Sequence, residues 1–119
     1  MPKVLVVDDN RDILEVVAFI LSRHEMNVTT LLDPALVRQF IAIHRPDILL
    51  MDIAMGNYDG RVLCRQIKRS SWKTLPVILF SARNYPSDSI AESMADGIIE
   101  KPFSINDLCG AIQRLLSTA

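Results

Sequence analysis

Five short apolar segments, separated by stretches with helical periodicity, constrain the fold of this chain more than any other feature. They are KVLVV (3–7), NVTTLL (27–32), DILLM (47–51), PVILF (76–80) and GIIE (97–100). Strands that alternate with helices indicate repeated βα units and a parallel sheet. All but NVTTLL are nearly continuous in apolar character, which predicts strands covered on both faces.

The intervening stretches predict helices that each have one apolar face. The residues expected to face the sheet are Ile13, Val16, Val17, Ile20, Leu21, Leu36, Val37, Phe40, Ile41, Val62, Leu63, Ile67, Ile105, Leu108, Cys109, Ile112, Leu115 and Leu116. Asp33 before Pro34 supplies an N-cap and a first-turn proline for the second helix, whereas Ser104 and Asp107 form a capping box for the last. The third helix is expected over about residues 59–69.

The fourth helix is expected to be weak. Only about residues 87–94 are available for it, Pro86 stands before it, and Ile90 and Met94 are its main apolar anchors. A helix of about two turns contributes little stability of its own. This segment is therefore predicted to be weakly held.

Nothing in the sequence divides the chain into parts. It has 119 residues, half of them hydrophobic, and no linker, internal repeat or low-complexity segment. This length suits one domain that needs no metal or disulfide to fold. We therefore predict a single (βα)5 domain over residues 1–119. Right-handed crossovers then favour a doubly wound α/β sheet with strand order 2-1-3-4-5.

Charge and cysteine content exclude several classes of function. Thirteen basic and fourteen acidic residues give a net charge of -1, with no basic cluster to attract nucleic acid or a membrane surface. Cys64 and Cys109 are too few for a disulfide framework or a zinc site, so reduced thiols are expected. The N-terminal apolar run is too short for a signal peptide, and no run approaches the ~18 residues of a membrane span. We expect a cytoplasmic protein with no direct nucleic-acid or membrane partner.

Polar side chains stand at the ends of four predicted strands. Asp8 and Asp9 follow the first strand, Asp52 the third, Ser81 the fourth and Lys101 the fifth. In open α/β sheets the ligand crevice lies beyond the carboxyl ends of the strands, where the strand order switches. We therefore expect these five side chains to converge at one edge of the sheet.

Each of these residues taken alone also has an ordinary structural interpretation. The alternatives are helix capping by Asp8, Asp9 and Asn10, a turn at Asp52, a helix cap at Ser81 and a surface charge at Lys101. Three converging carboxylates, however, repel one another and have raised pKa values unless a cation compensates. A hard divalent ion such as Mg²⁺, which takes oxygen ligands and keeps several waters, meets that requirement.

Four short motifs occupy these strand ends. They are VLVVDD (4–9), DIAM (52–55) followed by DG (59–60), FSA (80–82) and EKPF (100–103). Together they resemble the response-regulator receiver domains of two-component signalling, in particular those like the chemotaxis regulators. The resemblance extends strand by strand over the whole chain and implies a flavodoxin-like fold.

By this resemblance Asp52 is the phosphoacceptor. It would take a phosphoryl group from a phosphohistidine of a sensor histidine kinase or a histidine phosphotransfer protein, and the domain would catalyse only its own phosphorylation and dephosphorylation. The resulting switch would control an effector domain or output protein that the sequence does not identify. A free-standing regulator, the receiver part of a longer regulator or hybrid kinase, and a homodimer formed on phosphorylation all fit. The initial methionine favours a native N-terminus.

The resemblance also implies the ligands of the site. Those of Mg²⁺ are Asp9, Asp52, the backbone carbonyl of Ala54 and, through a water, Asp8. Lys101 would pair with one phosphoryl oxygen, and the Ser81 hydroxyl would donate to another. The Lys101–Pro102 bond corresponds to the cis peptide of the family.

Two other functions stay open. An aspartyl-phosphate hydrolase of the haloacid dehalogenase type also places an aspartate after a strand and uses Mg²⁺, but it needs a second aspartate where this chain has Ala54. A degenerate receiver-like domain would bind partners without being phosphorylated. Steady hydrolysis of phosphoesters would identify the first, and failure to accept phosphate from acetyl phosphate the second.

The segment before Lys101 departs from the family pattern. It is about two residues short, Ser81 stands where threonine is commoner, and Ile98 takes the place of the usual aromatic switch residue. Isoleucine is stiff about χ1 and cannot act by the same ring motion. We therefore predict that phosphorylation orders or shifts residues 82–96.

Two further expectations concern the loops around the site. Met55–Gly56 replaces the usual Met-Pro, which predicts a more permissive and mobile loop. Ala54 and Arg83 are expected to flank the path of the hydrolytic water. Since alanine donates nothing to that water, slow self-dephosphorylation follows.

Overall fold

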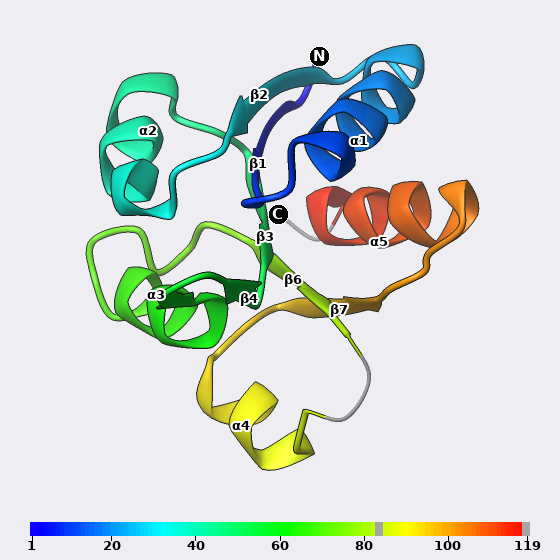
Figure 1. Cartoon of the computed structure of the whole chain (residues 1–119). Coiled ribbons are helices and arrows are strands. Elements are labelled where there is room, and N and C mark those ends of the chain that lie inside the picture. Colours follow the sequence, from blue (N-terminus) through cyan, green and yellow to red (C-terminus); the bar gives the residue numbers. More distant parts are fainter. Residues whose placement is uncertain (83–84, 118–119) are drawn as a thin grey trace.

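A five-stranded parallel sheet with helices on both faces forms the protein (Figure 1). The structure is a computed structural model and describes residues 1–82 and 85–117. The strands, in the spatial order β2-β1-β3-β6-β7, are Asn27–Leu31 (β2), Lys3–Val7 (β1), Ile48–Asp52 (β3), Val77–Ser81 (β6) and Gly97–Glu100 (β7). Numbered along the chain without the small hairpin strands, this is the predicted order 2-1-3-4-5 of a doubly wound, flavodoxin-like sheet.

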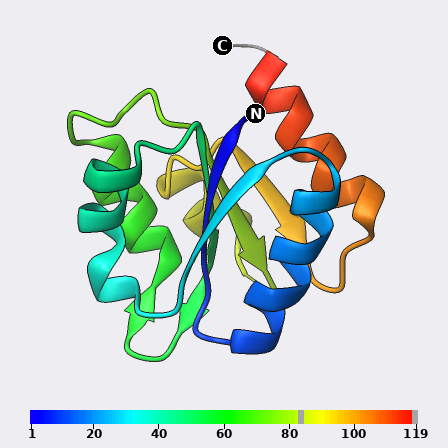
Figure 2. The same ribbon diagram turned by 90° about the horizontal axis from the view of Figure 1, so that it is seen from above.

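Helices α1 and α5 cover one face of the sheet, and α2 and α3 cover the other (Figure 2). The helices are Arg11–Arg23 (α1), Val37–His44 (α2), Gly60–Lys68 (α3), Ser87–Glu92 (α4) and Ile105–Ser117 (α5). A single 3₁₀ turn, Pro34–Leu36 (η1), leads into α2. In the part of the chain that the structure describes, no helix has the length and apolar character needed to cross a membrane.

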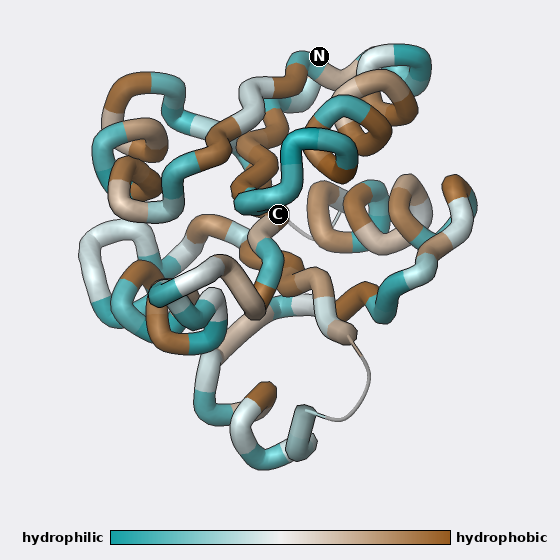
Figure 3. Tube along the Cα trace, viewed as in Figure 1, coloured by the Kyte–Doolittle hydropathy of each residue, from teal (hydrophilic) through white to brown (hydrophobic). Residues whose placement is uncertain are grey.

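Alternate strand residues divide the core into two clusters. In β1, Val4 and Val6 face α1 and α5, whereas Leu5 and Val7 face α2 and α3. This alternation follows from the period of two along a strand. Because helices cover both faces, the interior strands β1, β3 and β6 read as continuous apolar runs, as predicted, and they are brown in Figure 3.

Of the two predicted helix caps, the one before α5 is confirmed and the one at Asp33 caps a preceding turn. Asp33 accepts a hydrogen bond from the Ala35 N–H (3.0 Å), although it caps η1 rather than α2 itself. The predicted capping box opens α5, since the Asp107 N–H donates to Ser104 Oγ (3.0 Å) and the Ser104 N–H to Asp107 (3.4 Å). Asn10 caps α1, and its side chain accepts from two N–H groups of the first turn.

The outer strand β7 is less covered than predicted. Only Ile99 is buried in it, and Ile98 is 38% exposed. The prediction of burial on both faces was wrong here because β7 is an edge strand and its neighbouring helix α4 has only six residues. The other edge strand, β2, is half exposed, as its polar residues predicted.

Some residues predicted to face the sheet face solvent instead. Val16, Val62 and Ile105 are each at least half exposed. The core stripe of α1 contains Leu14, which the predicted pattern omitted. Apolar residues cover more of these helices than the narrow stripe that the sheet can contact, so periodicity alone did not identify the buried stripe. Met94, expected to anchor the fourth helix, is also exposed (44%) and lies beyond the end of α4.

A small hairpin that the sequence did not predict follows β3. Its strands are Ala54–Met55 (β4) and Tyr58–Asp59 (β5), joined by a two-residue loop. Gly56 has φ 60°, and a positive φ at the first loop position is what a type II′ hairpin turn requires. The Met55–Gly56 segment, expected to form a permissive loop, is therefore part of a paired structure. The expected mobility stays a prediction.

Candidate functional site

Three carboxylates meet beyond the carboxyl ends of β1 and β3. Asp8, Asp9 and Asp52 each offer an oxygen that lies within 4.8 Å of the others. Asp8 is completely buried and Asp52 is 8% exposed, whereas Asp9 is open to solvent. Since β1 and β3 pair in parallel register, with Val7 opposite Met51, their ends place these groups side by side.

The helix-capping alternative for Asp8 and Asp9 does not apply, because Asn10 caps α1 instead. Asp8 Oδ1 accepts a hydrogen bond from the Asn10 N–H at 2.9 Å. This bond fixes the Asp8 carboxylate in the acidic cluster. The hydrophilic loop after β1 is visible as a teal segment in Figure 3.

Lys101 supplies the positive charge of the site. Its Nζ donates to Asp8 Oδ2 at 3.3 Å and lies 3.1 Å from Asp52 Oδ1. The same ammonium group is 5.8 Å from the centroid of the Phe80 ring. Lys101–Pro102 is cis, as predicted, and the Lys101 N–H donates to the Ser81 carbonyl at 2.9 Å. Lys101 is therefore held at both its backbone and its side chain and is not an ordinary surface charge.

The pKa of Asp52 is raised above its ordinary value. The largest cause is burial, and the neighbouring Asp8 charge adds to it; Lys101 opposes both. The carboxylate thus sits where negative charge is costly, with one lysine providing partial compensation. A cation bound to the cluster would favour its ionised form.

Ser81 reaches the same edge of the sheet, but among the described residues its hydroxyl donates to a backbone carbonyl and not to the carboxylates. Its hydroxyl is buried and donates to the Ala82 carbonyl at 2.7 Å. The helix-cap alternative fails, because α4 begins six residues later, after Pro86. Its predicted contact with a phosphoryl group stays a prediction.

Two site features escaped sequence reasoning. The Phe80 ring, which lies below Lys101 Nζ, stacks on Phe103 with the ring centroids 5.2 Å apart. Gly60 approaches the backbone of Asp52 so closely that a Cβ there would lie 2.1 Å from the Asp52 carbonyl oxygen. The Asp-Gly pair at 59–60 was the signal for this contact, since a glycine often marks a close backbone approach.

The residues present fit a hard divalent cation. The donors are all carboxylate oxygens, as Mg²⁺ prefers, and one of them is exposed enough for the ion to keep waters. Both Asp8 oxygens already accept hydrogen bonds, which suits the predicted contact through a water. Ala54 lies in β4, two residues after Asp52. Its carbonyl as a ligand stays a prediction.

The two histidines make contacts within their own helices and do not contribute to the acidic cluster. His24 caps α1 through an Nδ1 contact with the Ile20 carbonyl at 2.8 Å, and the His44 ring lies against Phe40. Both lie at helix C-termini, where a partial negative charge suits an imidazole. Arg83, predicted beside the hydrolytic water, lies outside the described residues.

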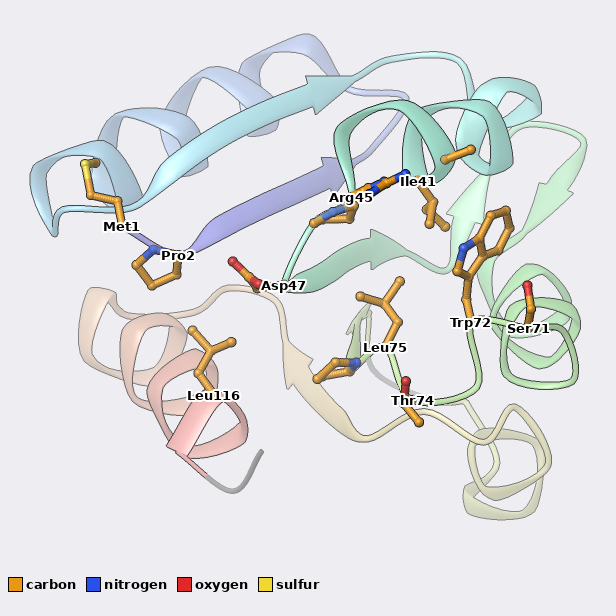
Figure 4. A pocket seen from close by; sticks show the side chains of 13 residues that line it. Met1, Pro2, Ile41, Arg45, Asp47, Ser71, Trp72, Thr74, Leu75 and Leu116 are labelled. Carbon is orange, nitrogen blue, oxygen red and sulfur yellow. The ribbon is translucent and has the colours of Figure 1, made fainter.

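An apolar hollow of about 840 Å³ opens at the opposite end of the sheet (Figure 4). Its lining includes Pro2, Asp47 and Pro76, which precede β1, β3 and β6. Trp72 borders the hollow and packs partly on the core. The hollow is therefore separated from the acidic cluster by the length of the strands.

The fold and the acidic cluster together define a class, the receiver-type α/β domain, and comparison with known families gives the same result. The sequence model of the family described as response regulator receiver domain matches residues 4–113. The chain belongs to this family.

Relatives place the same domain in different contexts. Response regulator MprA of Mycobacterium ulcerans (strain Agy99) is 34% identical over 116 residues, which cover 96% of this chain and 50% of that protein. The chain thus spans about half the length of the curated relatives it matches. The signal receiver domain of a histidine kinase from Syntrophus aciditrophicus is 30% identical, with a TM-score of 0.93 and coverage of 100% and 92%. Chemotaxis response regulator CheY4 of Vibrio cholerae is 25% identical, with a TM-score of 0.86 and coverage of 97% and 98%.

Proposed function

We propose that this receiver domain switches an output by accepting a phosphoryl group on Asp52. The observation that carries the proposal is the position of Asp52, where a buried carboxylate meets two further aspartates and Lys101. The family membership gives the signalling role, and this geometry supports Asp52 as the proposed phosphoacceptor. The proposed domain covers residues 1–119, because α5 packs on the sheet up to its last turns.

In the proposed reaction a carboxylate oxygen of Asp52 attacks the phosphorus of a phosphohistidine. The new O–P bond forms as the P–N bond breaks, and the imidazole nitrogen leaves with the electron pair and takes up a proton. Phosphoryl transfer needs positioning and charge neutralisation rather than further covalent chemistry. Lys101 would move its ammonium contact from the carboxylate to a phosphoryl oxygen, and a rotation of the Ser81 hydroxyl would supply a second donor.

Mg²⁺ is the proposed cofactor. Asp9 and Asp52 would hold it together with the Ala54 carbonyl, and Asp8 would contact it through a water. When bound, it supplies positive charge to the phosphoryl oxygens during transfer. Its absence from solution should therefore prevent modification of Asp52.

The proposed phosphodonors are a sensor histidine kinase or a histidine phosphotransfer protein in the cytoplasm. The two free, buried cysteines agree with a reducing compartment. The proposed output is an effector domain or a separate output protein, and a homodimer formed on phosphorylation is proposed as well.

Incubation with acetyl phosphate and Mg²⁺, followed by intact-mass measurement, tests the proposal. We expect one added phosphoryl group in the wild type, and none in Asp52→Asn or in wild type treated with EDTA. Asp9→Asn should reduce the yield, because it removes the exposed carboxylate of the cluster. An unmodified wild type would instead favour the degenerate receiver. The same yield in Asp52→Asn would place the modification elsewhere.

A further inference from the structure

Arg61, the second residue of α3, contacts three other side chains, two of them in or next to α4. Its Nε and Nη2 donate to the two oxygens of Asp59, at 3.0 Å and 2.7 Å. Its Nη1 donates to Ser89 Oγ in α4 at 2.9 Å. Its guanidinium carbon lies 4.6 Å from the ring centroid of Tyr85. One planar group therefore joins α3 to both α4 and the segment before it.

The start of α3 is itself fixed to the backbone that follows the phosphoacceptor. Asp59 pairs with Ala54 in the small hairpin and caps α3 by accepting from the Arg61 N–H at 2.9 Å. The Gly60 N–H donates to the Ile53 carbonyl at 2.8 Å. Since Gly60 also lies against the Asp52 carbonyl, any movement of that backbone must displace the first turn of α3.

Helix α4, in contrast, packs on the core mainly through the partly buried Ile90. It is six residues long, contains no buried residue and has no side-chain N-cap hydrogen bond. Beyond its end, Lys68 of α3 donates to Asp96 at 2.8 Å, which ties the entry of β7 to the same helix. Two cations of α3 thus hold the α4 segment, one near each end. A segment with so little burial changes position at small energetic cost.

The same neighbourhood contains a cleft of about 240 Å³ beside the acidic cluster. Ile53, Ala54, Arg61 and Tyr85 are among the residues that line it. Backbone two residues from Asp52 therefore faces the ring that Arg61 contacts.

We propose that Arg61 couples the state of Asp52 to the position of α4. The inference rests on the proposed function, in which Asp52 is the phosphoacceptor. Phosphorylation shifts the backbone at residues 52–54 and with it the first turn of α3, and the rigid guanidinium fork transmits that shift to Tyr85 and Ser89.

Hydrogen exchange of the full chain tests the coupling. Peptides covering residues 85–96 are followed in Mg²⁺ with and without beryllofluoride, and ¹⁹F NMR measures occupancy of Asp52 separately. Allosteric couplings are typically about 5- to 150-fold, so the wild type should show a ratio of exchange rates between the free and occupied forms in this range. In Arg61→Ala the ratio should fall toward one at full occupancy.

Control variants separate coupling from simple structural support. Arg65→Ala removes an arginine one turn further along α3 that lines the α3–α4 surface, and it should keep the wild-type ratio. Arg61→Lys keeps the charge but loses the fork, and Ser89→Ala removes one acceptor, so both should reduce the ratio. If Arg61→Ala does not fold, Ser89→Ala and Tyr85→Leu test the same connection from the α4 side.

Three results would overturn the inference. In one, Arg61→Ala speeds exchange equally in both states and keeps the ratio, which would make Arg61 a static brace. In another, occupied wild type shows no change over residues 85–96. In the third, the wild type shows no occupancy by ¹⁹F NMR; the proposed function then fails, and the coupling fails with it.

Discussion

The carboxyl end of β3 and the outer edge at β7 and α4 are built in different ways. Every residue of β3 is buried, and its end is fixed by pairing on both sides, by Gly60 and by the Lys101 ion pair. The β7–α4 edge has one buried strand residue and a six-residue helix held largely by polar contacts. The first region holds the Asp52 carboxylate in place, whereas the second has little buried surface to hold it.

This contrast indicates how the domain can combine precise chemistry with a mobile response. A site that positions a phosphoryl group needs side chains supported by rigid elements. A switch needs an element whose two positions differ little in free energy, which favours a segment with little buried surface. The two requirements are met in one small domain by placing the site at the centre of the sheet and the weak helix at its edge.

The largest expected difference between the two regions is in the loss of stability when a side chain is truncated in each. Leu50→Ala in β3 removes a fully buried side chain and should lower the free energy of unfolding by about 2–5 kcal/mol. Ile98→Ala in β7 should cost less than about 1 kcal/mol, because that side chain is already partly exposed. Urea denaturation measures both. Equal losses would mean that the edge is as firmly packed as the centre.

A pair of glycine substitutions sharpens the comparison at the site. Gly60→Ala places a methyl group against the Asp52 carbonyl and should destabilise the fold by about 1–3 kcal/mol while reducing modification by acetyl phosphate. Gly110→Ala in α5 meets open space and should stabilise the helix by about 0.5–1 kcal/mol. A stable, fully modifiable Gly60→Ala protein would contradict the role assigned to this close approach.

Sequence alone was sufficient for the centre of the sheet and insufficient for its edge. The ends of the apolar strands located Asp8, Asp52 and Lys101, because parallel strands bring their carboxyl ends together wherever the helices are placed. The exposure of Ile98 depends on how much of the edge strand α4 covers, which no local pattern encodes. The contact between Arg61 and Ser89 joins residues 28 apart, so no periodicity could indicate it.

The smallest expected effect compares the two buried thiols, one on each face of the sheet. Cys64 in α3 is fully buried, and burial raises its pKa to about 12; Cys109 in α5 is slightly exposed, and its pKa is raised in the same direction. A raised folded-state pKa stabilises the protein below the ordinary thiol value of about 8.5, and this contribution is lost as the pH rises toward the folded-state value. Between pH 8 and pH 9.5 the wild type should therefore lose about 1 kcal/mol of stability that Cys64→Ala does not lose. Urea denaturation at both pH values gives the difference, with Cys109→Ala as the control on the other face. Parallel stability curves for the wild type and Cys64→Ala would show that the thiol in α3 reaches solvent far more easily than its burial indicates. The α3 face would then be less firmly packed than the contrast between the centre of the sheet and its edge implies.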